Sequence, residues 1–231
     1  MKRIKTSNIL IATALLLIIL FFLFVFLVIH HYSKVVYSDT QKQEAVQYSN
    51  YQEVPHFSVI VLSADEKVKI LKGEKYALKY SGTLAYTLSG DTLYPQNQMI
   101  IITPSVKTII AKNQSVFDLQ LSQDSLNLIL GDDVVGKIEK SNFRNINIIA
   151  SNSAFLKVTP ETNLGNVHIL LTDRAKASLL GEIDTLSGQT SNKTFLYTSH
   201  CKNITAIIKG THTKITGGKK NFGVYIEKES N

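Results

Sequence analysis

The 231-residue chain has few of the residues that staple or nucleate small domains: one cysteine, no tryptophan and four prolines. A single cysteine cannot close a disulfide within the chain, which excludes a disulfide-stapled domain. The length suits one domain with a moderate core and excludes a large multidomain enzyme. Signatures for dinucleotide and phosphate binding, zinc hydrolysis, serine hydrolysis and dithiol redox chemistry are also missing. The sequence therefore predicts no cofactor, no metal and no catalytic residue.

The net charge of +7 does not indicate a nucleic-acid partner. Lys2, Arg3, Lys5 and Lys34 all precede the first acid, Asp39, so residues 35–231 carry 21 basic residues against 18 acidic ones. Nucleic-acid binding needs basic residues gathered on one face, and here they alternate with acids. We expect no nucleic-acid partner.

Residues 9–29 form an uninterrupted apolar run of 21 residues, in which Thr13 is the only polar side chain. At about 1.5 Å per residue, a helix of this length spans roughly 31 Å, close to the hydrocarbon core of about 30 Å. A cleavable signal sequence would have a shorter apolar run followed by a small-residue cleavage site. The run therefore predicts an uncleaved, single-pass membrane anchor.

The flanks of the apolar run predict its orientation. Residues 1–8 contain three basic residues and no acidic one, whereas Asp39 and Glu44 follow soon after the apolar run. The positive-inside rule therefore predicts that residues 1–8 stay in the cytoplasm. Residues 30–55 are mostly polar and without clear periodicity, and predict a stalk or linker. Residues 56–228 then form the predicted extracytoplasmic domain.

The extracytoplasmic domain has the pattern of an all-β protein. Short runs rich in Val, Ile, Leu, Thr, Tyr and Phe recur from Phe57 onward, each followed by turn-forming residues. No window of 12 or more residues sustains a helical stripe. Turn signals such as Lys72-Gly73 and Ser89-Gly90-Asp91 predict antiparallel hairpins, or a lead-in sheet, over residues 57–104.

A repeat of about 20 residues follows Pro104, with units starting at Val106, Leu126, Ile146 and Val167. Each unit opens with an apolar strand (VKTII, LNLIL, INIIA or VHILL) and then reaches a polar turn. The turn residues are Asn113, Asp132 with Asp133, Asn152 with Ser153, and Asp173. Asn and Asp tolerate left-handed backbone conformations, so these residues are suited to the corners of a coil. The period predicts a β-solenoid in which each strand stacks on the one before it.

A β-sandwich is the alternative interpretation of this repeat, because paired short strands also give an apparent period near 20 residues. We favour the solenoid, since four consecutive units keep their phase to within a residue. Residues 187–193, SGQTSNK, break the phase and predict a loop. The segments FLYTSH, NITAIIKG and FGVYIEK are then predicted as closing strands.

The lead-in, the segment GDTLYP and the stacked units LNLILGDD, INIIASNS and VHILLTDR resemble the head GIN domain family, described as "putative auto-transporter adhesins". The resemblance covers about residues 57–226. It implies a right-handed parallel β-helix-like solenoid in the envelope of a Gram-negative bacterium, with the domain on the periplasmic or outer side. Of the turn glycines usual in the family, Gly131 is kept, whereas Ser151, Asn152 and Thr172 occupy corresponding positions. The resemblance therefore implies location and fold more than activity.

Three triplets match the acid, hydroxyl, aliphatic pattern of O-glycosylation in some bacteria that carry this family. They make Thr92, Ser125 and Thr185 candidate modification sites.

Few side chains offer catalytic chemistry. Cys201 follows His200, but neighbours on a strand point to opposite faces, so we expect a free, buried or half-exposed thiol. His168, His200 and His212 lack metal-ligand spacing. Asp132, Asp133 and Asp173 could line one edge of a coil as catalytic carboxylates, but their corner positions favour a role in turns.

Two functions remain open from the sequence. The first is a non-enzymatic adhesion or binding module, or an envelope scaffold, whose partner is an envelope protein or a glycan. The second is an envelope polysaccharide hydrolase or lyase that uses carboxylates on the solenoid face.

Overall fold

The computed structural model describes residues 48–63, 66–210 and 212–217, and their regular structure consists of seventeen β-strands. The predicted membrane helix at residues 9–29 lies outside the described residues, as do residues 1–8, most of the stalk and the segment FGVYIEK. Within the described part of the chain, no helix is long and apolar enough to cross a membrane.

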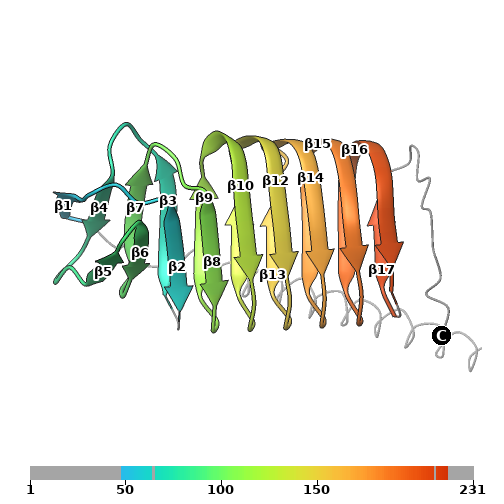
Figure 1. The fold of residues 1–231 in the computed structure, drawn as a ribbon, viewed down its shortest axis with the longest axis horizontal. Coiled ribbons are helices and arrows are strands. Elements are labelled where there is room, and N and C mark those ends of the chain that lie inside the picture. Colours follow the sequence, from blue (N-terminus) through green and yellow to red (C-terminus); the bar gives the residue numbers. More distant parts are fainter. Residues whose placement is uncertain (1–47, 64–65, 211, 218–231) are drawn as a thin grey trace, which may run out of the picture. The chain divides into compact units, whose positions relative to one another are not determined.

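The centre of the structure is a parallel β-solenoid (Figure 1). Each coil contains a strand on one side, a tight corner and a strand on the other side. The coils run through β8 (Thr108–Lys112), β9 (Val116–Gln120), β10 (Ser122–Leu130), β11 (Val135–Ile138), β12 (Asn142–Ala150), β13 (Phe155–Val158), β14 (Asn163–Leu171), β15 (Lys176–Thr190), β16 (Phe195–Lys209) and β17 (Lys214–Gly217). From β8 to β16, each strand pairs in parallel with the equivalent strand of the next coil. The predicted solenoid is therefore confirmed, and the sandwich is excluded.

The register confirms most of the predicted repeat. Leu126 pairs with Ile146, and Ile146 pairs with Val167. The first unit was predicted one residue too early, because Asn127 pairs with Thr108 and Leu126 therefore aligns with Lys107, not with Val106. Val106 is apolar and buried, so it continues the apolar pattern of the strand. The shift of one residue was therefore not visible in the sequence.

The loop predicted at residues 187–193 is wrong for most of its length. Residues 187–190 belong to β15 and pair with β14 on one side and β16 on the other. Their polar composition suggested a loop, but neighbouring coils supply the backbone hydrogen bonds of the strand. The two segments FLYTSH and NITAIIKG form a single strand, β16, so the solenoid continues beyond the four predicted units.

The antiparallel lead-in is confirmed in part. β1 (Asn50–Glu53), inside the predicted stalk, pairs antiparallel with β4 (Ala77–Tyr80), and β4 pairs in the same way with β7 (Met99–Thr103). β5 (Tyr86–Ser89) and β6 (Thr92–Pro95) form a hairpin. The prediction is wrong for β2 (Val59–Ser63) and β3 (Lys67–Lys72), which pair in parallel with other coils.

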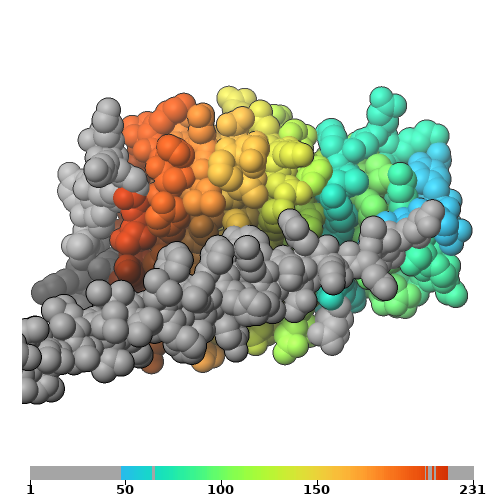
Figure 2. Space-filling view, turned by 180° about the vertical axis from the view of Figure 1, so that it is seen from behind, coloured from blue at the N-terminus to red at the C-terminus, as the bar shows by residue number. Residues whose placement is uncertain are grey.

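The coil of β2 and β3 is inserted out of sequence order. It lies between β6 and β7 on one side and β8 and β9 on the other, as the colours of the ribbon show (Figure 1). The space-filling view from behind shows the same interleaving (Figure 2). Alternating residues such as those of VIVLS determine which side of a strand is buried, but they do not select its partner strand.

The core is a stack of inward-facing side chains that alternate along each strand. In β10, for example, Leu126, Leu128 and Leu130 are buried. Residues of different size complement one another between coils: Phe117 lies against Gly136, where an added Cβ would come within 2.4 Å of the Phe117 ring. Close packing of this kind holds neighbouring coils in one register.

Candidate functional site

The corners between long and short strands are made by pairs of residues with left-handed backbone. Asn113 has φ 53° and Gln114 has φ 64°, and the same conformation recurs at Asp132 with Asp133, Asn152 with Ser153, Asp173 with Arg174, and Asn192 with Lys193. Two successive positive φ values define a type I′ turn, in which Asn and Asp are favoured at the first position. This confirms the corner role predicted for the turn residues of the four units, whereas Gln114, Arg174, Asn192 and Lys193 were not predicted as corner residues.

Corner residues of neighbouring coils also bond to one another. Asn152 Nδ2 donates to Asp132 Oδ1 at 2.8 Å, and Asn192 Nδ2 donates to Asp173 Oδ1 at 3.0 Å. Backbone N–H groups continue the ladder, for example from Ser153 to the carbonyl of Asp173 at 2.9 Å. Along this column, which we call the corner ladder, Asn113, Asp132, Asn152, Asp173 and Asn192 alternate between amide and carboxylate. Asp132 and Asp173 therefore serve the turns, and they lie two coils apart, with Asn152 in the coil between them.

A groove with a cavity volume of about 300 Å³ lies elsewhere on the solenoid, across β10, β12, β14 and β15. We call it the amide groove. Its lining consists of Ser125, Leu126, Asn127, Asn145, Ile146, Asn147, Asn166, Val167, His168, Thr185 and Ser187. Asp132, Asp133 and Asp173 are not among these residues, and no lining residue is an aspartate, glutamate, lysine or arginine. Side-chain amides and hydroxyls supply most of its polar groups.

Strand register arranges the polar lining in two rows. The first row contains Ser125, Asn145, Asn166 and Thr185, and the second contains Asn127, Asn147, His168 and Ser187; members of each row are register partners in neighbouring coils. The buried residue between the two rows, such as Ile146, points into the core. Successive members of each row are therefore about 4.8 Å apart, and each row runs along the solenoid axis.

Hydrogen bonds within the groove leave part of its polar groups free. Asn166 Nδ2 donates to Asn145 Oδ1 at 3.0 Å, and His168 Nδ1 lies 3.2 Å from Ser187 Oγ. Within the described residues, no side-chain hydrogen bond engages Asn127 or Asn147. Each of these two amides offers two donor hydrogens and one acceptor oxygen to a bound molecule.

An apolar row borders the amide groove on the same face. Val61, Ile110, Ile129, Ile149 and Leu170 are register partners in five neighbouring coils, and each is partly exposed. We call them the aliphatic row. On β10 and β12 the aliphatic side chain follows the second-row asparagine by two residues, which places both on the same side of the strand. The face therefore offers hydrogen-bonding groups beside aliphatic surface.

The short strands carry a charged cluster that the sequence did not reveal. Asp118 is the register partner of Lys69 and Lys137, and Lys137 forms an ion pair with Glu139. Burial raises the pKa of Asp118, an effect that the charge of Lys137 opposes. Because the two lysines balance the two carboxylates, we interpret the cluster as a structural ion-pair network.

The remaining candidates are dispersed. Cys201 is free and half-buried, as predicted, and donates to the carbonyl of Asn203 at 3.3 Å. Burial raises the pKa of its thiol, more than the Asn203 and Leu186 backbone lowers it, which disfavours the nucleophilic thiolate. His200 and His212 are exposed and outside the groove. Within the described residues, no group of three or more His, Cys, Asp or Glu side chains could hold a metal ion.

Two of the three candidate modification sites line the amide groove. Ser125 and Thr185 occupy opposite ends of the first row of the groove, whereas Thr92 lies on β6, outside it. Sequence reasoning treated His168 only as a polar strand residue and missed Asn127, Asn145, Asn147 and Asn166. The signal was present in the polar residue on each side of the apolar starting residue, as in Asn-Ile-Asn and Asn-Val-His.

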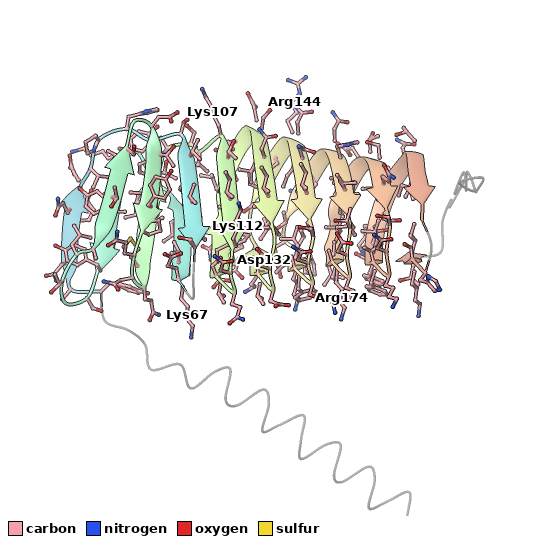
Figure 3. All side chains as sticks on the ribbon, turned by 60° about the horizontal axis from the view of Figure 1, so that its bottom comes forward. Lys67, Lys107, Lys112, Asp132, Arg144 and Arg174 are labelled. Atoms are coloured by element: carbon pink, nitrogen blue, oxygen red, sulfur yellow. The ribbon has the colours of Figure 1, made fainter. Side chains whose placement is uncertain are left out.

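Figure 3 separates two edges of the solenoid. Lys107 and Arg144 lie along the top of the view, and Asp132 of the corner ladder lies lower, as does Arg174, the neighbour of Asp173. Arg144 directly precedes the first-row residue Asn145, so the amide groove begins on the side away from the corner aspartates.

Comparison with known proteins supports the fold. No family model matches the chain, and no curated protein sequence matches it. A crystal structure from Bacteroides fragilis, described as "a putative adhesin", matches with a TM-score of 0.51 and 11% sequence identity. The match covers 73% of this chain and 95% of that one, and shows that the two share a fold.

Proposed function

We propose that this chain is a non-enzymatic binding module whose amide groove receives an envelope partner. In this proposal residues 9–29 anchor the chain in the cell membrane of a Gram-negative bacterium, and the solenoid lies on the extracytoplasmic side. The proposal includes membership of the head GIN domain family, on the resemblance of the lead-in and the stacked units.

The observation that carries the binding role is the amide groove itself. Its two rows present hydrogen-bonding groups in register on a rigid sheet, and Asn127 and Asn147 have no partner among the described side chains. Glycoside hydrolysis requires a pair of carboxyl groups that flank the scissile bond, and the groove lining contains none. Its chemistry therefore suits recognition better than proton transfer.

The comparison gives independent support for this role. The protein from Bacteroides fragilis, described as "a putative adhesin", has a similar fold over almost its whole length. Adhesion is a binding activity that needs an exposed, rigid surface, which a stack of coils provides.

Site-specific photo-cross-linking in intact cells tests the binding role. A photoreactive residue at Asn147 should capture an envelope component, because this side chain lines the groove. The matched control is Asn142, an exposed asparagine of the same strand that does not line the groove. Equal labelling from both positions, or capture that persists in an Asn127→Ala background without any loss, would contradict a binding role for the groove.

Membrane fractionation tests the proposed anchor. The full chain should remain in the membrane after alkaline extraction, and a variant without residues 9–29 should be released. A full chain that is extracted as readily as the deletion variant would remove the anchor from the proposal.

The enzymatic alternative has its own test. If the chain is a polysaccharide hydrolase or lyase, the combined substitution Asp132→Asn, Asp133→Asn and Asp173→Asn should abolish any activity detected on envelope polysaccharide. We expect no such activity in the unsubstituted chain, because Asp132 and Asp173 bond to neighbouring asparagines in the corner ladder.

A further inference from the structure

We infer that the ligand of the amide groove is a neutral glycan chain that lies along the solenoid axis, across several coils. This inference rests on the proposed binding role of the groove and names its ligand class. Three observations carry it: the uncharged lining, the spacing of the polar rows, and the aliphatic row beside them.

The lining selects against charged ligands. It contains amides, hydroxyls and one imidazole, without any side chain of permanent charge. A charged ligand would lose hydration in the groove and gain no ion pair in return, which is costly. Sugar hydroxyls are neutral and both donate and accept hydrogen bonds, as do the amides of Asn127 and Asn147.

The spacing of the rows distinguishes a glycan from an extended peptide. Equivalent side chains recur every coil, at about 4.8 Å, whereas equivalent side chains on one face of an extended peptide recur at about 6.8 Å. A peptide laid along the axis would lose register after one coil. A pyranose ring is close in length to one coil spacing, so successive sugars can meet successive members of each row.

The aliphatic row accounts for the apolar part of such a ligand. Sugar rings have hydroxyl groups at their rim and C–H groups on their faces. Ile129 and Ile149 lie two residues from Asn127 and Asn147, on the same side of β10 and β12. A chain with its hydroxyls toward the two polar rows would pack its C–H groups against the aliphatic row, removing apolar surface from water.

The decisive experiment measures binding of defined probes to the full chain in detergent solution. Isothermal titration would use neutral hexamers of β-linked glucose, mannose and N-acetylglucosamine, with an acidic hexamer of galacturonate and an uncharged extended peptide for comparison. We expect at least one neutral hexamer to bind and the two comparison ligands not to bind. Its affinity should be the same at low and high salt, because salt screens only charged contacts.

Substitutions locate the binding. Asn127→Ala with Asn147→Ala should weaken binding about 25-fold, since a net contribution of about 1 kcal/mol per hydrogen bond is a factor of about five for each amide. The control pair, Asn142→Ala with Asn163→Ala, removes two exposed, register-paired amides outside the groove and should leave the affinity unchanged. Selective ¹⁵N labelling of asparagine should show side-chain shifts for Asn127 and Asn147 on addition of the same hexamer.

The outcomes separate this inference from the proposed function. Binding of the acidic hexamer or the peptide, with a loss in the groove variant, would overturn the glycan assignment and leave the groove as a binding site. Failure of all neutral hexamers to bind the folded chain would also overturn it. Binding that the groove variant and the control variant retain equally would place the ligand elsewhere and overturn the groove assignment as well.

Discussion

The corner ladder makes a strong prediction for Asn152→Asp. The substitution changes one atom group, but it places a carboxylate between those of Asp132 and Asp173 in one column. It also removes the hydrogen bond that Asn152 Nδ2 donates to Asp132 at 2.8 Å. The order of the column would change from alternating amide and carboxylate to three carboxylates in succession.

The expected loss of stability follows from two contributions. Two unit charges about 5 Å apart in water repel by about 0.8 kcal/mol, so two neighbouring aspartates contribute about 1.7 kcal/mol. Loss of a hydrogen bond to a charged acceptor adds about 1.5 kcal/mol. We therefore expect Asn152→Asp to lower the free energy of unfolding by about 3 kcal/mol at neutral pH and low salt.

The control Asn152→Ala removes the hydrogen bond without adding a charge. It should cost only about 1.5 kcal/mol and should respond little to salt. In a triple variant with Asp132→Asn, Asn152→Asp and Asp173→Asn, one carboxylate stands among amides, and most of the stability should return. Together these variants separate the charge contribution from the hydrogen-bond contribution.

The pH dependence gives the sign of the charge effect. Neighbouring carboxylates raise the pKa of the new carboxyl in the folded state above its unfolded value. The charge contribution to the destabilisation is therefore complete above that pKa and disappears as the pH falls below the ordinary carboxyl range. Urea unfolding of the full chain, followed by circular dichroism, measures these differences. An Asn152→Asp chain as stable as the unsubstituted one, or a loss independent of both pH and salt, would refute the reasoning.

Three further predictions concern the core and its titratable groups. Gly136→Val should lower the unfolding free energy by about 3 kcal/mol in the same urea assay, because its Cβ would lie within 2.4 Å of Phe117, and combining it with Phe117→Leu should restore part of the loss. Alkylation of Cys201 should require a higher pH in the folded chain than in urea, because burial raises the pKa of its thiol; identical pH–rate profiles would contradict this. Glu66→Gln should stabilise the chain at neutral pH and not at acidic pH. Burial raises the pKa of Glu66 in the folded chain, and the hydrogen bond from the Ser63 backbone offsets this in part. The protonated carboxyl therefore stabilises the fold below the unfolded pKa, and this stabilisation is lost as the pH rises through the folded pKa. A stability difference that does not change with pH would contradict it.

The solenoid could be predicted from the sequence because every coil has the same local requirements. Each coil needs alternating apolar residues to fill the core and a corner that accepts positive φ, and residues such as Leu126, Ile146 and Asp132 meet these demands within one unit. The coil of β2 and β3 could not be predicted in the same way. Its residues satisfy the local pattern, but its neighbours in the stack come from residues 92–103 and 108–120, later in the chain.

The candidate site was hidden because it depends on register. Offsets between neighbouring coils vary, with Asn127 paired to Asn147 twenty residues later and His168 paired to Ser187 after nineteen. A drift of one residue would turn each polar side chain to the other side of its strand. The polar residues were visible in the sequence, but their alignment into rows was not.

By itself, then, the sequence determined the all-β class, the corners of the coils and the inward face of most strands, since propensity and alternation act over a few residues. Tertiary structure alone decided which coils are neighbours, that residues 187–190 extend a strand, and that Asn127 and Asn147 share a groove with His168. These features depend on hydrogen bonds between residues 18 to 49 positions apart, and short-range preferences do not specify such pairings.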